Sequence, residues 1–404
     1  MKKVLLTYQR AFSGLPAQVR HLSIALFINR AGSMVVMYLA LYLTKQIGLT
    51  PAGAGKILSI YGMGSLAGTM LGGYLSDSIG PKQVQLFSLF STAFLFVLLS
   101  IISNVYGIAV TAFFLAAAAD AFRPANNAAA AQAAPPEIRA RAFALNRLAI
   151  NLGFAIGPTI GGLLARINYH YLFYIDGLSS ALAGFYLAFF TPSYRSKTSR
   201  RAQSRSVHLD GILFGMLALL FFIGLVFFQL FSTWPLYLRN QIGLVENQIG
   251  VLMGLNGLMI ALCELPLVLH LEKLHPLPII AYGSLMICLG FALTPVFHSP
   301  LWLCFTVLLW TLGEMLTMSL SAAFIANRAP DERRGGAMGL YSFTFSLSMI
   351  FAPLIGGRIY EKYSSTALWA IIGLIGVGLF FCFHLLQVLL EAQVKSRGDG
   401  RHSL

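Results

Sequence analysis

Several ionisable side chains stand inside long apolar stretches of this sequence, where a charge needs a partner or water. Arg30 lies in the stretch F-I-N-R-A-G-S-M. Asp120 and Arg123 are three residues apart in another stretch, so a helix would place them on one face, where they could form a neutral pair. A charge at the middle of a bilayer costs about 2.5–3.5 kcal/mol even on the more lenient insertion scale. We therefore expect each of these residues either to be paired or to line a water-filled path.

Carboxyl groups in such stretches are also candidates for reversible protonation. Glu314 has no cation near it in the sequence, and Glu264 stands two residues before a proline, where a helix would bend. Asp176 has a simpler alternative, a structural pair with Arg147 or Arg30. The candidates for binding and releasing a proton are Glu314, Asp120, Glu264 and Asp176.

The elements that position these residues follow from the composition. Hydrophobic residues make up 57% of the 404 residues and charged residues only 10%, with a mean hydropathy of +0.75. Apolar runs of about 20 residues recur along the chain, each long enough to cross a hydrocarbon core of roughly 30 Å. The sequence therefore predicts an all-α membrane protein. We predict twelve spans, over residues 18–45, 51–76, 82–104, 106–132, 139–166, 170–192, 209–239, 246–271, 277–297, 300–327, 334–360 and 365–391.

The net charge of +14 is explained by membrane topology. The N-terminus, the even-numbered loops, the segment 193–208 and the C-terminal tail carry most of the 28 Lys and Arg residues, which indicates that this side is cytoplasmic. Three tryptophans, Trp234, Trp302 and Trp369, fall near the opposite ends of the spans, as interfacial anchors would. No basic face of a soluble module is present, so nucleic acid is not an expected partner.

The two halves of the chain repeat. A shift of 195 residues, the difference between Gly55 and Gly250, also pairs Pro158 with Pro353. The same shift pairs Gly62 with Gly257, Pro135 with Pro330, Glu137 with Glu332, Arg139 with Arg334, and Gly161-Gly162 with Gly356-Gly357. We therefore predict two six-helix bundles, residues 1–192 and 209–391, joined by a basic linker at 193–208 and followed by a tail at 392–404. Such halves enclose a site near the bilayer midplane and rock around it.

Two motifs resemble those of the major facilitator superfamily, and the resemblance covers essentially the whole chain. The stretch G-Y-L-S-D-S-I-G-P-K, residues 73–82, is similar to that family's loop between helices two and three. Ser78 and Pro81 stand where the family usually has basic residues. The stretch G-F-A-I-G-P-T-I-G-G, residues 153–162, is similar to the signature of the proton-antiport exporters, although the usual basic motif early in helix four is not recognisable.

The resemblance implies roles for both motifs. Asp77 would accept hydrogen bonds from the N-terminus of helix eleven, with arginines after helices four and ten as partners, and would latch one conformation. The small residues and Pro158 of helix five would form a bent, closely packed seal against a helix of the other half, with ordinary packing as the alternative. The expected gating residues are Gly73, Asp77, Gly80, Lys82, Gly153, Gly157, Pro158, Gly161, Gly162, Arg139 and Arg333.

The resemblance also places the first and fourth helices of each half-repeat around a central cavity. Arg30 and Arg123 would bind an anionic group or modulate the acids, beside an aromatic wall with polar spots. The expected cavity residues are Arg30, Arg123, Tyr38, Tyr42, Tyr61, Gln229 and Asn256. The alternative for the tyrosines is packing or contact with lipid, since aromatic residues occur throughout the chain.

Together these features predict a secondary active transporter that exports a drug, a metabolite or a siderophore-like compound in exchange for protons. A proton-coupled nutrient importer is the alternative. We expect a monomer in the bacterial inner membrane, surrounded by lipid, with both termini cytoplasmic. Enzyme motifs and metal-ligand spacings are absent from the sequence, and no nucleotide-binding loop occurs, so the expected energy source is a proton gradient without a cofactor.

Overall fold

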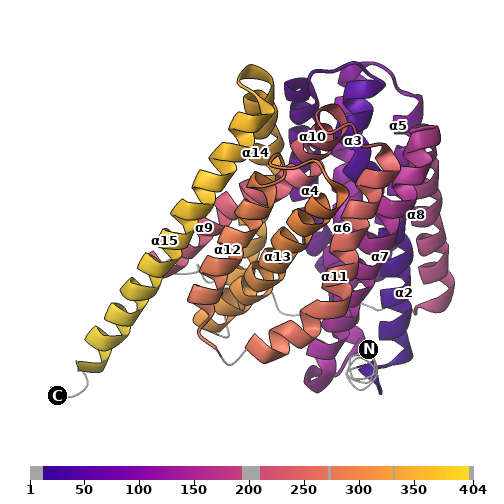
Figure 1. The fold of residues 1–404 in the computed structure, drawn as a ribbon. Coiled ribbons are helices and arrows are strands. Elements are labelled where there is room, and N and C mark those ends of the chain that lie inside the picture. The colour runs from indigo at the N-terminus through magenta and orange to yellow at the C-terminus, as the bar shows by residue number, and fades with distance from the viewer. Residues whose placement is uncertain (1–11, 193–209, 272–273, 331–332, 400–404) are drawn as a thin grey trace. The chain divides into compact units, whose positions relative to one another are not determined.

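The computed structural model describes residues 12–192, 210–271, 274–330 and 333–399, and within these ranges the regular elements are helices. The α-helices are α2 (Ala17–Ala31), α3 (Val35–Lys45), α4 (Pro51–Ser78), α5 (Pro81–Ile101), α6 (Val105–Ala133), α7 (Arg139–Ile167), α8 (His170–Phe190), α9 (Gly211–Phe227), α10 (Thr233–Asn240), α11 (Glu246–Leu271), α12 (Pro276–Ala292), α13 (Pro300–Arg328), α14 (Arg334–Lys362) and α15 (Ser365–Asp399) (Figure 1). Two 3-10 turns, η1 (Pro136–Ile138) and η2 (Phe228–Phe231), complete the elements.

These helices fit the predicted spans and make the chain a multi-pass membrane protein. In the described part of the chain, ten spans are long and apolar enough to cross a membrane, and α12 is a shorter apolar helix. Two spans are each built from two helices, the first from α2 and α3 and the seventh from α9, η2 and α10. The prediction of an all-α membrane fold is confirmed, with the first span broken near its middle and the seventh interrupted after the 17 residues of α9.

Short polar side chains set where several helices begin. Thr50 precedes Pro51 and accepts a hydrogen bond from the Gly53 amide, and Asn104 accepts one from the Gly107 amide. The turn between α4 and α5 depends on Gly80, whose φ of 96° lies in the left-handed region that favours glycine. The predicted loop motif is therefore a tight connection between two spans.

The described chain divides into two compact units. Of the described residues, the first unit comprises 12–192, 229–262 and 353–362, and the second comprises 210–228, 263–271, 274–330, 333–352 and 363–399. The boundary passes through α11 and α14, because one end of each of these helices packs with the first half of the sequence. The division into sequence halves at 193–208 stays a prediction, since that linker lies outside the described residues.

In the first unit, α4 and α6 pack through a row of glycines. A Cβ placed on Gly64 or Gly68 would lie 2.1 Å from the carbonyl oxygen of Phe113 or Ala117 respectively. Only residues without a side chain let two backbones approach this closely. This crossing fixes α6, which carries Asp120 and Arg123, against the second span.

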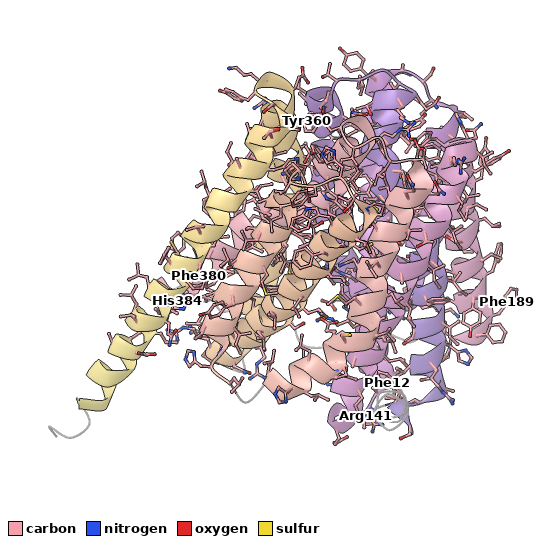
Figure 2. All side chains as sticks on the ribbon, viewed as in Figure 1. Phe12, Arg141, Phe189, Tyr360, Phe380 and His384 are labelled. Carbon is pink, nitrogen blue, oxygen red and sulfur yellow. The ribbon has the colours of Figure 1, made fainter. Side chains whose placement is uncertain are left out.

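In the second unit, α12 packs against α13 and α15 through aromatic rings. The Phe291 ring stacks on Trp310 at 5.4 Å and on Trp369 at 6.3 Å between ring centroids. Phe380 and His384 lie together on α15, where their rings are 4.4 Å apart (Figure 2). Trp234 and Trp369 are fully buried, so the expectation that they are interfacial anchors is wrong: the burial of a large ring in the core replaces contact with headgroups.

The repeat is visible in individual hydrogen bonds. Arg139 Nε donates to the Ala131 carbonyl at 3.0 Å in the first unit. Arg334 Nε donates to the Ala326 carbonyl at 3.1 Å in the second unit. Both residues of the second bond follow from the first by adding 195. Each arginine holds the end of the preceding span, so the two halves share this detail of their folding.

Candidate functional site

Two helix crossings in the first unit are related by the same 195-residue shift. A Cβ on Gly55 of α4 would lie 2.3 Å from the carbonyl oxygen of Pro353 in α14. A Cβ on Gly250 of α11 would lie 2.4 Å from the carbonyl oxygen of Pro158 in α7. A helical proline removes the N–H that would bond an upstream carbonyl and makes the backbone irregular there. A glycine–proline crossing is thus used twice, once for each half.

Neighbouring contacts repeat in the same way. A Cβ on Gly162 would lie 2.5 Å from the Glu246 carbonyl oxygen, and one on Gly357 would lie 2.7 Å from the Pro51 carbonyl oxygen. In both crossings a glycine of the fifth helix of one half meets the start of the second helix of the other half. We call the end of the first unit that holds these two crossings, with their four glycine contacts, the closed end, because the helices there touch backbone to backbone.

Ionic contacts join the same helices at the closed end. Lys45 Nζ donates to Glu246 Oε1 at 2.7 Å, and the Tyr169 hydroxyl donates to the same oxygen at 2.8 Å. Arg239 Nε lies 3.7 Å from this oxygen. The Glu246 side chain is only 7% exposed. Burial, and then the Glu246 carboxylate, raise the pKa of the Tyr169 phenol, which therefore stays a donor at neutral pH. This Glu246 cluster ties the first, sixth, seventh and eighth spans together.

Two further side chains close this end. The Tyr38 hydroxyl donates to the Pro158 carbonyl at 2.7 Å and lies 3.3 Å from the Glu246 carbonyl oxygen. Glu361 of α14 accepts a hydrogen bond from the Ala52 amide at 2.9 Å, where an anion also suits the positive end of α4. Polar contacts therefore accompany both glycine–proline crossings.

The helix-five signature faces two different neighbours. Gly153 and Gly157 lie against the backbone of Arg30 and Ala31 at the end of α2. Pro158 lies instead against α11, where the Thr159 hydroxyl is 3.3 Å from the Gly250 carbonyl oxygen. One face of α7 thus packs within its own half, and the other face packs against a helix of the second half; the gating role of these residues stays a prediction.

The first span is broken between α2 and α3, and Asp176 occupies the break. Its carboxylate accepts hydrogen bonds from the Met34 amide at 3.0 and 2.9 Å and from the Val35 amide at 2.8 Å. These amides begin α3 and have no carbonyl partner within a helix. Asp176 is 1% exposed, and its contacts are those of a helix cap rather than the expected pair with Arg147 or Arg30.

Arg30 stands at the other side of this break. It interacts electrostatically with Asp120, Arg123 and Tyr61, all of the first unit. Within the described ranges, no ion pair of 4 Å or less joins Asp120 to Arg123 or to Arg30. The neutral pair expected from the i, i+3 spacing is therefore not formed as a direct contact, and these charges remain separate.

The second unit holds the two remaining acids. Glu264 is 7% exposed and accepts a hydrogen bond from the Ser319 hydroxyl at 2.8 Å. Glu314 is half-buried on α13, one helical turn before Thr317, whose buried hydroxyl faces Gly283 of α12. A hydroxyl partner is therefore available for Glu264, and a proton-coupling role for either acid stays a prediction.

The predicted cavity wall is mostly buried. Tyr38, Tyr42, Gln229 and Asn256 are at most 4% exposed. Tyr42 packs edge-on against Phe173, and Gln229 accepts a hydrogen bond from Thr233. A Cβ on Gly356 would lie 2.1 Å from the Gln229 side-chain oxygen. Tyr38, Tyr42 and Gln229 therefore have packing contacts in this conformation, and contact of any of these residues with a substrate stays a prediction.

The loop motif lies at the opposite end of the α4 helix. Asp77 is exposed there, and a Cβ placed on Gly73 would meet no described atom within 4 Å. Lys82 Nζ donates to the Ala188 carbonyl at 3.2 Å and to the Thr191 carbonyl. Arg141, which is near Phe12 in Figure 2, donates to the Ser13 carbonyl, and the Arg333 amide donates to the Pro330 carbonyl. The proposed Asp77 latch stays a prediction.

Comparisons with known proteins agree with this architecture. The sequence profile described as Major Facilitator Superfamily matches residues 22–353 and 246–402. The chain belongs to the major facilitator superfamily. It is accordingly a membrane transporter rather than an enzyme.

Individual relatives of this superfamily protein are distant. The MFS-type transporter YqjV of Bacillus subtilis is 26% identical over 84% of this chain and 85% of its own. The Na(+), Li(+), K(+)/H(+) antiporter of Planococcus maritimus is 24% identical over 81% and 86%, and the quinolone resistance protein NorA of Staphylococcus aureus is 22% identical over 90% and 93%. A solved peptide transporter POT in complex with sulfate shares the fold with a TM-score of 0.77 at 17% identity, covering 94% of this chain and 96% of its own.

Sequence reasoning missed the Glu246 cluster of this transporter. Lys45, Glu246 and Arg239 stand at the ends of predicted spans, where charged residues are common and carry no special signal. A usable signal did exist in the repeat, because the shift pairs Gly55 with Gly250 and Pro158 with Pro353. What the sequence lacked was the information that each glycine meets the proline of the other half.

Proposed function

We propose that this transporter exports a small organic molecule in exchange for protons. The observation that carries the proposal is the closed end, where two glycine–proline crossings related by the 195-residue shift seal the helices against each other. A seal with such pseudo-symmetry suits a protein whose halves rock around a central site. The antiport signature on α7 takes part in both the seal and the packing against Arg30, which supports export over import.

We further propose that the closed end faces the outside. The basic linker and tail favour a cytoplasmic position for both termini. The first span, which starts near the N-terminus, ends at Lys45 in the closed end. The bacterial relatives support placement in the inner membrane. The conformation described here would then have its outer gate shut. We propose that the protein acts as a monomer.

For proton coupling we propose Glu314 first and Asp120 second. Glu314 is half-buried on α13, and Thr317 follows it by one helical turn on the same helix. Glu264 accepts a hydrogen bond from the Ser319 hydroxyl, and Asp176 accepts bonds from the backbone amides at the start of α3. A relative named for cation/proton antiport and one named for quinolone resistance support exchange and efflux respectively.

The test is substrate-induced proton movement in proteoliposomes that contain a pH-sensitive dye. Ethidium, as an organic cation, and 1-anilinonaphthalene-8-sulfonate, as an organic anion, serve as the probes. Antiport predicts that protons move opposite to the transported probe, and that Glu314→Gln abolishes this movement while the protein still inserts. Glu391→Gln, at an exposed position on α15, is the matched control and should behave as wild type.

Two outcomes would contradict the proposal. Normal proton movement in Glu314→Gln would remove the coupling assignment. Protons that move in the same direction as the probe would favour the proton-coupled importer, and counterflow from preloaded vesicles would give the direction independently.

A further inference from the structure

One histidine and two aromatic rings form a cluster where α2 and α8 pack together in the first unit. His21 Nδ1 and the Tyr186 hydroxyl oxygen lie 2.8 Å apart, and the His21 ring stacks on Phe190 with 5.6 Å between ring centroids. The Tyr186 and Phe190 rings are themselves 4.8 Å apart. Because His21 is in the second turn of α2 and Phe190 is the last residue of α8, this His21 cluster lies at the ends of two spans. The proposed orientation puts those ends on the cytoplasmic side.

Neighbouring helices hold the end of α8 in place. Tyr186 packs against the buried core around Leu22. Lys82 Nζ of α5 donates to the Ala188 carbonyl at 3.2 Å and to the Thr191 carbonyl. The His21 cluster is therefore presented by packed helices rather than by a loop.

The bond between His21 and Tyr186 leaves one hydrogen-bond donor over. A neutral imidazole carries one N–H and a phenol carries one O–H, and the contact uses only one of these two hydrogens, whichever tautomer is present. The other hydrogen, on His21 Nε2 or on the Tyr186 hydroxyl, can donate to an acceptor outside the cluster. Arg20, which precedes His21 on α2, is exposed, and within the described ranges no ion pair of 4 Å or less involves it. This end of α2 therefore offers both hydrogen-bond donors and a positive charge.

Apolar side chains continue from these donors toward the interior of the membrane. Ile24, one turn after Arg20 on α2, is exposed, and so is Phe185, one turn before Phe189 on α8. Phe189 itself is 81% exposed and projects away from the helices (Figure 2). Both helices belong to segments that are long and apolar enough to cross a membrane, so these side chains face lipid. The order of donors and then apolar groups matches the order of headgroup and acyl chain in a phospholipid.

We infer that Arg20, His21 and Tyr186 bind the phosphate group of an anionic phospholipid in the cytoplasmic leaflet, whose acyl chains lie along the exposed apolar side chains of α2 and α8. A phosphate oxygen accepts the hydrogen that the His21–Tyr186 bond leaves over, and the Arg20 guanidinium supplies charge and paired donors. Basic groups between the cytoplasmic ends of spans suit anionic headgroups for this reason. A zwitterionic headgroup presents the same phosphate but carries its own ammonium group, so net charge favours the anionic lipid. The inference goes beyond the proposed transport function.

The second half of the chain offers an internal comparison. A shift of 195 residues leads from Phe189 to His384 on α15, whose ring centroid lies 4.4 Å from that of Phe380 and 6.1 Å from that of Tyr282. There the histidine Nδ1 donates to the Phe380 carbonyl of its own helix at 2.8 Å. The exposed carboxylate of Glu391 follows two turns later on α15 and would repel a phosphate. We therefore expect the anionic lipid at the His21 cluster and not at His384.

Native mass spectrometry of the full-length transporter, released from detergent micelles, tests the site by counting bound lipid molecules. Phosphatidylglycerol and phosphatidylcholine with identical acyl chains are the probes, titrated separately. We expect wild type to bind the first phosphatidylglycerol about fivefold more tightly than the first phosphatidylcholine, which is the effect of one arginine beside an anionic headgroup. Arg20→Gln should remove most of this preference, and Arg20→Lys should retain most of it.

A double variant tests the hydrogen that the cluster leaves over. His21→Phe combined with Tyr186→Phe keeps both rings but removes both donors, and it should weaken phosphatidylglycerol binding about fivefold. Either replacement alone leaves one donor in place and should have a smaller effect. Arg20 is exposed, so Arg20→Gln keeps the test valid even where the double variant does not fold. Arg166→Gln, at an exposed position near the end of α7, and His384→Gln are the controls and should leave the preference unchanged.

Other results would overturn the inference. Equal binding of both lipids by wild type, or an unchanged preference in Arg20→Gln, would remove the headgroup site. Displacement of bound phosphatidylglycerol by inorganic phosphate would identify a soluble ligand instead. Dimers whose abundance falls in Phe189→Ser would show that a second copy covers this face. Each of these results would leave the transport proposal standing, because the proton-movement assay depends on none of these variants.

Discussion

Lys45 and Glu246 form an ion pair at 2.7 Å that joins the end of the first span to the start of the eighth. The carboxylate also engages Tyr169 and lies near Arg239. Because the Lys45 side chain is 29% exposed, the pair by itself would contribute little. Its position beside the Pro158–Gly250 crossing makes it relevant to the opening of the closed end.

The first prediction concerns this pair. Glu246→Gln should increase about fivefold the fraction of molecules in which the helices of the closed end have separated, because Lys45 and Arg239 lose their counter-charge. This change corresponds to about 1 kcal/mol in the free energy of opening. Spin labels at Gln46 and Gln241, which are related by the 195-residue shift and exposed, would report the opening as a longer distance between the labels. The labels require a background without the four native cysteines.

Glu391→Gln, at an exposed position on α15, is the control for this measurement. An unchanged distance distribution in Glu246→Gln would show that the backbone crossings alone keep this end shut.

The second prediction concerns the crossings themselves. Gly250→Ala should prevent closure and abolish transport, because the new methyl group would lie 2.4 Å from the Pro158 carbonyl oxygen. Gly55→Ala should have the same effect through Pro353. Transport in proteoliposomes and the same spin-label distances would measure both. Gly339→Ala on α14, where no described atom lies within 4 Å of the new carbon, should retain wild-type transport.

If only one of the two glycine variants lost transport, the crossings would not be functionally equivalent. The contacts related by the repeat would then be shared folding features rather than two halves of one gate.

The third prediction separates a cap from a proton carrier. Asp176→Asn should lower the free energy of unfolding by about 1–3 kcal/mol, because the α3 amides lose a charged acceptor. It should leave the number of protons moved per substrate unchanged. Thermal unfolding and the proteoliposome pH assay measure the two quantities. A normal stability with lost proton movement would instead identify Asp176 as a coupling residue.

The fourth prediction concerns the loop motif. Lys82→Met should destabilise the fold by about 1 kcal/mol, because Lys82 donates to the Ala188 and Thr191 carbonyls at the negative end of α8. Lys56→Met, at an exposed position on α4, should have no measurable effect on thermal unfolding. A loss of transport at unchanged stability would favour a gating role for Lys82, as the family resemblance implies.

Much of the fold could be predicted, for reasons that apply to each residue separately. A run such as residues 82–104 must span the membrane because its side chains are apolar, and Gly80 must make the turn before it because a positive φ excludes most other residues. The break near Gly32 was not predicted. The residues on either side of the break are as apolar as those of an unbroken span. The break depends on Asp176, which lies on another span and accepts hydrogen bonds from the amides there.

By itself, the sequence determined that the chain spans a membrane and that its halves repeat with a shift of 195 residues. It also indicated, through residues 73–82 and 153–162, a resemblance to the major facilitator superfamily. Each of these depends on residue type or on spacing along the chain. The tertiary structure alone decided that Gly55 meets Pro353, that Lys45 meets Glu246, and that Asp176 caps a helix while Arg30 forms no ion pair within the described ranges. These outcomes depend on which side chains converge from different spans, and hydropathy cannot rank one apolar crossing above another.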